Sequence, residues 1–425
     1  MKLIVTIYET TFDSALRAIA ALRDADHDMI ELRAEKLGAI DLNALRASTS
    51  KPILLTHRGT RVDDALIARA VAAGIDLVDV EWHPSLTIER FRERIVLSHH
   101  DYEGMSGSID AMRRFGCAHV KLAVTPKTME ENIQLLAPLT RPSDSQGLLP
   151  ARGEKVPEGR MRGITVIGMG ERGLYSRVLA PFHGSEFAFV GNAAPGQITL
   201  ERALAIYGSD RATLNAQHVF AIAGNPAGHS LSPSIHNPLF RERGVDAAYT
   251  IASFETFDEI ARAFERGDLR GMSITAPFKE EAFAYAERVD AHIRGNARAC
   301  GAINTLVKMR DGCIVADNTD VDGFEALIGT PRNVAIVGAG GTAKAAIVAA
   351  QRAGARYTIF NRSSHEPLEK VRDFDGDLII DTLPVPIELP PIRTITASYT
   401  KSEDGLALLR AQAVRQNEIF IEAIQ

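Results

Sequence analysis

Residues 334–350 read VAIVGAGGTAKAAIVAA, a continuous apolar strand followed by a glycine-rich turn and an alanine-rich helix. Glycines in such a turn let the backbone approach a pyrophosphate closely, and the N-terminus of the following helix attracts its negative charge. A glycine-rich turn is informative when it stands between a strand and a helix, as it does here. The stretch therefore predicts an α/β fold with a Rossmann-type nucleotide-binding domain.

The next strand, YTIFNRSS at 357–364, ends with Arg362 where enzymes that use NAD commonly present an acid to the ribose diol. Arginine pairs instead with a 2′-phosphate, so NADP is the expected cofactor. The candidate cofactor-binding residues are Gly338, Ala339, Gly340, Gly341, Thr342, Asn361, Arg362 and Ser363.

Upstream of the turn, GMSITAPFKE, GAINTLV and ADNTDVDGF place Lys279, Asn304 and Asp320 at three strand-to-loop junctions. A Lys and an Asp brought together would form a proton-transfer pair, in which the ammonium polarises a carbonyl. In GNPAGHSLSPSIHN, Ser230 and Ser232 are spaced to aim two hydroxyls at one carboxylate. The alternative is that these serines cap the helix that follows Pro233.

In the first half of the chain, short β-branched runs alternate with amphipathic stretches. This pattern is typical of successive βα units and predicts a compact (β/α)₈ TIM barrel. The expected strands are LIVTI, MIELRA, PILLTH, LVDVEW, RIVLSHH, HVKLAV, ITVIGM and FAFVGN, with helices near 14–24, 63–73, 129–136 and from 200. The polar stretch 138–163 is an expected excursion before the seventh strand.

The reactive side chains of a barrel come from the C-terminal ends of its strands. Those ends carry Glu31, Arg33, Arg58, His99, His100, Lys121 and Arg177. Lys121 stands in the apolar run HVKLAV, where burial disfavours the ammonium and favours the neutral amine that attacks a carbonyl. His100 would accept a proton near neutral pH. Taken singly, each of these residues has an ordinary structural alternative, such as a lysine that snorkels or an arginine on the surface.

Composition limits the remaining function classes. With 425 residues, 45% hydrophobic and 24% charged, the chain is expected to be globular with at least two domains. A net charge of -6 without a long basic run argues against nucleic acid or a membrane as partner and favours small molecules. The three cysteines lack metal-site spacing, so we expect no metal, buried thiols and a reducing cytoplasm. We also expect no signal peptide.

The barrel half resembles the type I 3-dehydroquinate dehydratase family through ELRAEKL, PILLTHRG, LSHHDY, VKLAVTP, SRVLAPFHGSEFAF and AAPGQI. The resemblance implies that Lys121 forms an imine with the substrate ketone and that His100 removes the C2 proton. It further implies that Glu31, Arg33 and Arg58 hold ring hydroxyls, whereas Arg177 and Gln197 bind the carboxylate. Two positions depart from the family: RGTRVDD replaces the usual Glu-Gly-Gly segment, and Ala193 replaces a lid serine.

The second half resembles the shikimate dehydrogenase family, most closely at HSLSPSIHN, GAINT and DNTD. This implies that Lys279 and Asp320 are the catalytic pair, and that the substrate is bound by Ser230, Ser232, Thr275, Asn304 and Gln412. Ser273 stands where the family usually has Asn. The stretch IIDTLPVPIELPPIRTITASYT at 379–400 is short and lacks the family's signals beside the nicotinamide.

The product of the first implied reaction is the substrate of the second. The resemblances together imply conversion of 3-dehydroquinate to 3-dehydroshikimate and its reduction to shikimate with NADPH. The expected domains are 1–212, 217–325 and 326–425, with the C-terminal helix returning to the middle domain. A homodimer is left open. The alternatives are a second half that prefers quinate or NAD, and a degenerate second half that does not catalyse.

Overall fold

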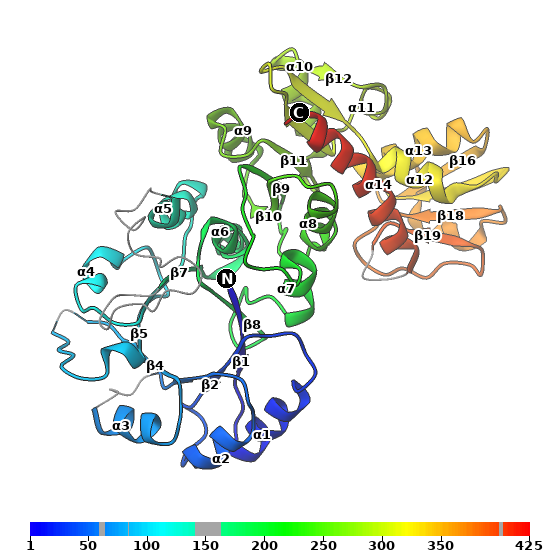
Figure 1. Ribbon diagram of the computed structural model, residues 1–425. Coiled ribbons are helices and arrows are strands. Elements are labelled where there is room, and N and C mark those ends of the chain that lie inside the picture. Colours follow the sequence, from blue (N-terminus) through cyan, green and yellow to red (C-terminus); the bar gives the residue numbers. More distant parts are fainter. Residues whose placement is uncertain (59–63, 84, 141–162, 399–402) are drawn as a thin grey trace. The chain divides into compact units, whose positions relative to one another are not determined.

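The computed structural model describes residues 1–58, 64–83, 85–140, 163–398 and 403–425. The chain divides into two compact units, Met1–Ala216 and Gln217–Gln425 (Figure 1). Each unit has its own sheets and its own buried core.

The first unit is built on an eight-stranded sheet in which each strand pairs in parallel with the next, and β1 also pairs with β8. A backbone hydrogen bond from Glu186 to the Ile164 carbonyl, at 2.8 Å, links β8 to β7. The expected TIM barrel is therefore confirmed. Its strands are β1 (Lys2–Ile7), β2 (Met29–Arg33), β3 (Ile53–Thr56), β4 (Leu77–Glu81), β5 (Ile95–Asp101), β6 (His119–Val124), β7 (Gly163–Gly168) and β8 (Phe187–Val190).

One face of these strands changes from apolar to polar along their length. Near the N-terminal ends, a buried cluster is formed by Ile4, Met29, Leu54, Val96, Phe187 and Phe189. Because alternate residues share a face, the residues two positions further on lie on the same side. These are the buried polar side chains Thr6, Glu31, Thr56 and Ser98. The strand order thus gathers polar groups at the C-terminal ends of the barrel.

The helices of the first unit follow the predicted alternation with one exception. They are α1 (Phe12–Ala21), α2 (Leu42–Ala47), α3 (Asp64–Ala72), α4 (Ile109–Arg113), α5 (Met129–Thr140), α6 (Gly170–Leu179) with the 3₁₀ turn η3 (Ala180–His183), and α7 (Leu200–Tyr207). Between β4 and β5 the described residues form only the 3₁₀ turn η1 (Arg92–Arg94). Phe91 there has a left-handed backbone with φ 59°, which a continuous helix does not permit. The expectation of eight regular βα units is wrong at this connection.

The second unit begins with a six-stranded sheet in the order β10-β9-β11-β13-β14-β12. Its strands are β9 (His218–Gly224), β10 (Ala247–Ser253), β11 (Gly271–Ile274), β12 (His292–Ile293), β13 (Thr305–Lys308) and β14 (Ile314–Asp317). Strand β13 runs antiparallel to both of its neighbours. The accompanying helices are α8 (Ser232–Glu242), α9 (Phe257–Arg266), α10 (Lys279–Arg288), α11 (Gly295–Cys300) and α12 (Asp320–Ile328).

A five-stranded parallel sheet completes the second unit, in the order β17-β16-β15-β18-β19. It comprises β15 (Asn333–Val337), β16 (Arg356–Asn361), β17 (Glu366–Pro367), β18 (Leu378–Asp381) and β19 (Thr394–Thr396), with α13 (Gly341–Arg352) following β15. The predicted Rossmann-type turn is therefore present between a strand and a helix. The last helix, α14 (Glu403–Glu422), packs against α8 and α12.

The two faces of this parallel sheet are covered differently. On one face, Val334, Ile336 and Leu378 pack with the alanines of α13 and with Phe324 of α12. The other face is covered by the 3₁₀ turn η4 (Leu368–Asp373) and by apolar residues of the β18–β19 connection, namely Leu383, Ile387, Leu389 and Ile392. Residues 382–393 form no helix. The short stretch identified in the sequence thus covers one face of the sheet with loop side chains.

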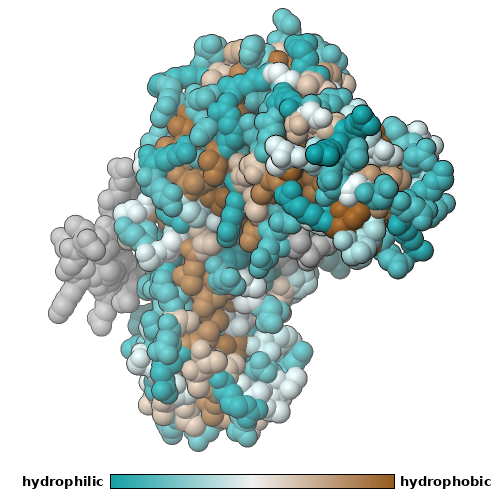
Figure 2. Space-filling view, turned by 90° about the vertical axis from the view of Figure 1, so that its right-hand side faces the viewer, coloured by the Kyte–Doolittle hydropathy of each residue, from teal (hydrophilic) through white to brown (hydrophobic). Residues whose placement is uncertain are grey.

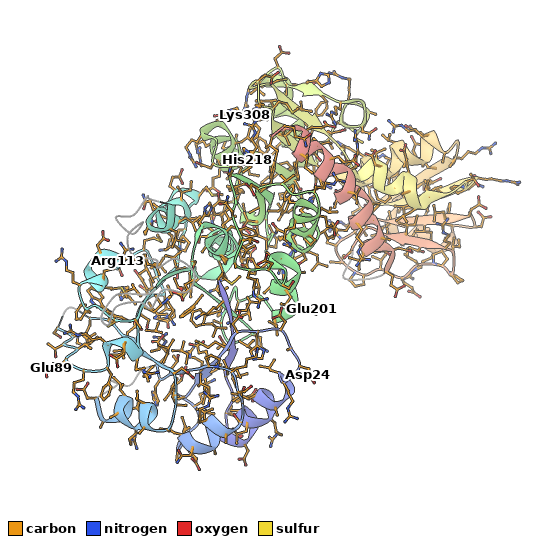
Figure 3. All side chains as sticks on the ribbon, in the orientation of Figure 1. Asp24, Glu89, Arg113, Glu201, His218 and Lys308 are labelled. Carbon is orange, nitrogen blue, oxygen red and sulfur yellow. The ribbon has the colours of Figure 1, made fainter. Side chains whose placement is uncertain are left out.

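No described helix is long and apolar enough to cross a membrane. Hydrophilic residues cover much of the face in Figure 2, with hydrophobic groups between them. Charged side chains such as Asp24, Glu89 and Glu201 are exposed (Figure 3). Of the three cysteines, Cys117 and Cys300 are buried as expected, whereas Cys313 is exposed. It lies in the tight turn before β14, where Met309 donates to its carbonyl.

Candidate active sites

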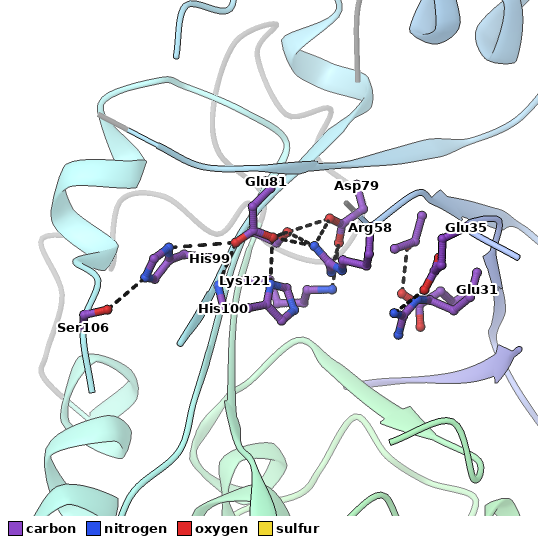
Figure 4. A network of polar contacts seen from close by, with 12 residues as sticks. Glu31, Glu35, Arg58, Asp79, Glu81, His99, His100, Ser106 and Lys121 are labelled. Atoms are coloured by element: carbon purple, nitrogen blue, oxygen red, sulfur yellow. Dashed lines mark hydrogen bonds and ion pairs between the residues drawn. The ribbon is translucent and has the colours of Figure 1, made fainter. Parts of the chain in front are cut away.

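Lys121 lies at the centre of a polar network at the C-terminal ends of the barrel strands (Figure 4). Its side chain projects from β6, is 2% exposed and donates from Nζ to Asp79 Oδ2 on β4 at 2.7 Å. The nitrogen also lies 4.5 Å from the ring centroid of Phe189. Besides the apolar strand that the sequence indicated, a buried carboxylate therefore faces the amine of Lys121.

Arg58 completes the charge balance around Asp79. Its Nη1 lies 2.9 Å from Asp79 Oδ1 and 2.6 Å from Glu81 Oε2. Burial alone would raise the pKa of Asp79, but the cations of Arg58 and Lys121 outweigh burial and hold that pKa well below its usual range. Asp79 is therefore a permanent anion between two cations.

His100 is oriented by Glu81. The carboxylate of Glu81 accepts the His100 backbone N–H at 2.8 Å and contacts the ring Nδ1 at 2.8 Å. This contact assigns the proton to Nδ1 and leaves Nε2 to act as a base. Burial lowers the pKa of His100, partly opposed by the bond to Glu81, so the neutral ring predominates near pH 7. The neighbouring His99 contacts Ser106 and the edge of Trp82, and its Nδ1 lies 3.9 Å from Oε1 of the same Glu81 carboxylate.

Asp101, which follows His100 in the sequence motif, has a different task. Its carboxylate accepts backbone N–H groups of Glu103, Gly104 and Ser106, so it shapes the loop after β5. The side chain of Ser106, together with these backbone N–H groups, holds the pKa of Asp101 far below its usual range.

Glu31 and Gln197 belong to one hydrogen-bonded chain. Glu31 accepts from the hydroxyls of Thr6 and Thr56, both at 2.8 Å, and Gln197 Nε2 donates to Thr6 Oγ1 at 3.0 Å. Arg33 pairs instead with Glu35 at 2.5 Å and lies beside the ring of Tyr8. All three sequence candidates therefore lie at the strand ends of the barrel.

Arg177 requires a correction. It lies on α6, not at a strand end as expected. Its Nε donates to the carbonyl of Gly168, the last residue of β7, at 2.8 Å. Burial lowers the pKa of Arg177 to about 10. The helix thus returns this guanidinium to the end of the barrel strand that precedes it.

In the second unit, Lys279 and Asp320 form the predicted pair. Lys279 Nζ lies 2.5 Å from Asp320 Oδ2 and 2.9 Å from Thr342 Oγ1. Asn304 Nδ2 donates to the other carboxylate oxygen of Asp320 at 2.9 Å. These groups line a cleft of about 170 Å³, together with Ser230, Ser232, Ser273, Thr275, Gln412 and Gln416. The structure therefore brings together every residue that the sequence suggested for this site.

The two serines precede and open helix α8. Ser232 is its first residue, and the N-cap position is Leu231, which makes no side-chain cap. The capping alternative holds for Ser230, because its Oγ accepts the backbone N–H of Ser232 at 3.2 Å. Ser230 Oγ also donates to Ser232 Oγ at 3.1 Å, and both side chains line the cleft.

Gln416 is a cleft residue that sequence reasoning missed. It lies one helical turn after Gln412 on α14 and is 1% exposed. Its Nε2 donates to the Asn304 carbonyl at 3.0 Å and to Thr305 Oγ1 at 2.7 Å, while its Oε1 accepts from Ser273 Oγ at 2.5 Å. The i, i+4 spacing of two glutamines on a helix expected to return to the substrate was the available signal.

The glycine turn lines a second cleft, of about 450 Å³, with Asn361, Arg362, Ser363 and Thr382. A Cβ at Gly340 would meet no atom within 4 Å, so this side of the turn is open to a ligand. A Cβ at Gly338 would lie 2.2 Å from Thr382 Oγ1, which explains the glycine there. The cleft, the open backbone and the helix N-terminus of α13 fit a dinucleotide pyrophosphate.

The turn after β16 is shaped by Asn361. Its Oδ1 accepts the backbone N–H groups of Ser363, Ser364 and His365. The Asn361 side chain thus stabilises the turn, and Arg362 and Ser363 line the cleft beside it. Residues 59–63 of the segment that replaces Glu-Gly-Gly, and residues 141–162 of the expected excursion, lie outside the described residues.

Two family models match the chain. Residues 3–213 match type I 3-dehydroquinase, and residues 222–306 match the shikimate dehydrogenase substrate binding domain. The second match ends before the five-stranded parallel sheet, which begins near residue 333.

Several known proteins are similar to this protein over most of the chain. The bifunctional 3-dehydroquinate dehydratase/shikimate dehydrogenase of Arabidopsis thaliana is 26% identical over 82% of the chain, which spans 63% of that protein. The shikimate biosynthesis protein AroDE of Chlamydia pneumoniae is 28% identical, covering 93% of the chain and 88% of that protein. The solved dehydroquinate dehydratase and shikimate dehydrogenase from S. pombe AroM is 21% identical, covering 100% of this chain and 98% of that chain, with a TM-score of 0.37.

Proposed function

We propose that the chain catalyses two consecutive reactions, because residues 3–213 match type I 3-dehydroquinase and residues 222–306 match the shikimate dehydrogenase substrate binding domain. The first unit removes water from 3-dehydroquinate to give 3-dehydroshikimate. The second unit reduces 3-dehydroshikimate to shikimate with NADPH. The observation that best supports the pair of reactions is the presence of Lys121 with His100 in one unit and Lys279 with Asp320 in the other.

In the first unit, Lys121 supplies the nucleophile. After losing a proton, its Nζ attacks the substrate ketone, and loss of water gives an imine. His100 Nε2 then takes the C2 proton, and the ring hydroxyl departs as water with the proton that His100 returns. Hydrolysis of the imine releases the product and restores Lys121. Glu31, Arg33 and Arg58 hold ring hydroxyls, and Arg177 and Gln197 bind the carboxylate.

In the second unit, Lys279 polarises the ketone. The nicotinamide supplies a hydride when the cofactor is bound. Lys279 donates a proton to the developing alkoxide. Asp320 orients the ammonium and relays the proton that replaces the donated one on Lys279. Ser230 and Ser232 bind the substrate carboxylate, and Thr275, Asn304 and Gln412 position the ring.

The cofactor preference rests on Arg362. NADP has a 2′-phosphate that a guanidinium binds, whereas NAD has a diol that an acid binds. Replacing Arg362 with Ala should raise the KM for NADPH at least about tenfold and leave the KM for NADH nearly unchanged. Equal effects on both cofactors would favour the alternative second half that uses NAD.

We also propose how the chain is divided into domains and where it acts. The domains are 1–212, 217–325 and 326–425, and α14 returns from the last domain to the middle one. The partners are small molecules, the compartment is the cytoplasm, and the assembly is a monomer or homodimer.

The decisive experiment supplies 3-dehydroquinate and NADPH to the purified protein. Dehydroshikimate absorbance and NADPH consumption are followed in parallel, and the assay is repeated with Lys121→Ala and Lys279→Ala. Each variant should lose its own step by about a thousandfold or more, while the other step continues when supplied with its own substrate. Dehydroshikimate that accumulates without NADPH loss in the wild-type protein would favour a degenerate second half.

A further inference from the structure

Thr342 connects the glycine turn to the catalytic lysine. It is the second residue of α13, and its hydroxyl oxygen accepts a hydrogen bond from Lys279 Nζ at 2.9 Å. Both residues line the nucleotide cleft and the substrate cleft. The contact therefore lies where the two clefts meet.

The backbone is built for this contact. A Cβ at Gly341 would lie 2.9 Å from Lys279 Cβ and 3.1 Å from its Cδ. Side-chain atoms do not approach so closely, so Gly341 makes room for the lysine stem. The neighbouring Gly340 has no such neighbour within 4 Å. One glycine of the turn thus faces open space, and the next faces Lys279.

The hydrogen bonds of Lys279 fix the direction of its remaining N–H. An ammonium has three donors in a tetrahedral arrangement. Asp320 Oδ2 accepts one at 2.5 Å, and Thr342 Oγ1 accepts a second. With the Cε–Nζ bond and two hydrogens placed, the third hydrogen has one direction left. Without Thr342, the bond to Asp320 alone would resist rotation of the ammonium about Cε–Nζ.

We propose that Thr342 is a positioning residue for Lys279, which aims the third N–H at the oxygen of the substrate ketone. The proposal rests on the proposed reduction in this unit. It differs from the role that the sequence suggests for Thr342, which is to contact the cofactor. The two roles predict different kinetics, because a cofactor contact affects NADPH binding and a positioning contact affects turnover at saturation.

The test compares Thr342→Val, which keeps the shape without the hydroxyl, with Thr342→Ser, which keeps the hydroxyl. Thr358→Val, at an exposed position on β16 that lines neither cleft, is the control for the same substitution elsewhere in this domain. At saturating NADPH and 3-dehydroshikimate, Thr342→Val should lower kcat about ten- to a hundredfold, because the reacting groups are misaligned. Thr342→Ser should stay within about threefold of the wild type, and so should Thr358→Val. The dissociation constant of NADPH, measured by its fluorescence, should change less than about threefold in Thr342→Val.

A second measurement uses the protein without cofactor or substrate. Trace labelling with acetic anhydride, followed by peptide mass spectrometry, reports the relative reactivity of each lysine amine. The Thr342 hydroxyl is one of the two acceptors that hold Lys279 Nζ, so Thr342→Val should release the amine and raise labelling of Lys279 several-fold relative to Lys370. Lys370 is an exposed lysine outside both clefts. Thr342→Ser should restore the wild-type ratio.

The outcomes separate this proposal from the proposed function. A raised NADPH dissociation constant with unchanged kcat at saturation would make Thr342 a cofactor contact and overturn the proposal. Unchanged Lys279 labelling in Thr342→Val would also overturn it. If the wild-type protein does not reduce 3-dehydroshikimate, the proposed function fails, and the labelling ratio alone decides whether Thr342 controls the lysine.

Discussion

Asp79 is the residue on which the electrostatics of the barrel site depend. It is 2% exposed and lies between the cations of Arg58 and Lys121. Removing a buried partner leaves the remaining charges uncompensated, at a cost of about 3 to 5 kcal/mol. The same anion holds Lys121 Nζ close to the end of β4. A single side chain thus both neutralises the site and places the nucleophile.

Glu81 should set the pH range of the dehydratase step. A base acts in its neutral form, so activity is lost as the pH falls through the pKa of His100. The pKa of His100 is lowered by burial, while its bond to Glu81 raises it. Glu81→Gln removes the raising charge, so the acid limb of kcat/KM should move to lower pH, and kcat should fall about tenfold or more. An acid limb that moved to higher pH would contradict this assignment of Glu81.

Ser273 and Gln416 should behave as one unit. Gln416 Nε2 must face the Asn304 carbonyl, so its Oε1 accepts from Ser273, and Tyr249 donates to Ser273 in turn. Gln416→Ala and Ser273→Ala should each raise the KM for 3-dehydroshikimate about five- to tenfold. The double variant should be little worse than either single variant, because both remove the same chain of bonds. Fully additive effects in steady-state kinetics would show that the two residues act separately.

At the scale of helices and strands, sequence patterns predict most elements but few of the side-chain contacts between them. The period of apolar residues identified every strand of the barrel, because burial follows that period. LVDVEW was recognised as a strand, yet nothing in its pattern showed that Asp79 and Glu81 would meet Lys121 and His100 from other strands. The sequence also predicts Arg177 at a strand end, whereas the residue lies on α6. Its side chain returns to the end of β7 because of how α6 packs, and no local sequence pattern indicates that packing.

Helix α8 should make the second unit sensitive to acid. His236 on this helix is 0% exposed and stacks on Tyr249 at 4.2 Å, and burial lowers its pKa to about 3. The unfolded chain takes up this proton near pH 6.5, whereas the folded chain does not. The contribution of His236 to the free energy of unfolding is therefore complete above that pH. It falls by about 1.4 kcal/mol per pH unit between about pH 6 and 3.

The measurement is urea-dependent hydrogen exchange of peptides from β9 and β10 at pH 7 and pH 5. His236→Phe should reduce the difference in the free energy of unfolding between pH 7 and pH 5, whatever its effect on that free energy at pH 7. A difference as large as that of the wild type would show that other groups cause the acid sensitivity.

At the scale of the whole molecule, each site is assembled from one unit. Lys121, Asp79 and His100 come from residues before 217, whereas Lys279, Asp320 and Thr342 come after it. The apolar clusters are also separate. The sequence indicated this organisation through two independent sets of motifs, but it did not reveal how loop residues cover one face of the last sheet.

Separately expressed fragments 1–216 and 217–425 should therefore each fold and keep their own activity. Because domains with their own cores fold alone, we expect kcat/KM of each fragment within about threefold of the intact chain. The check is the same pair of assays, with circular dichroism as a folding control. An inactive but folded fragment would indicate that its site needs the other unit.

The turn before β14 also has a practical consequence. Burial raises the pKa of Cys117 and Cys300 to about 12, so these thiols are slow to react, whereas Cys313 is exposed. A maleimide fluorophore should therefore attach at a single position of the native chain without mutagenesis. The dye would sit between β13 and β14. Asn304 directly precedes β13, so the dye would lie at the other end of this strand and would report motion in the second unit.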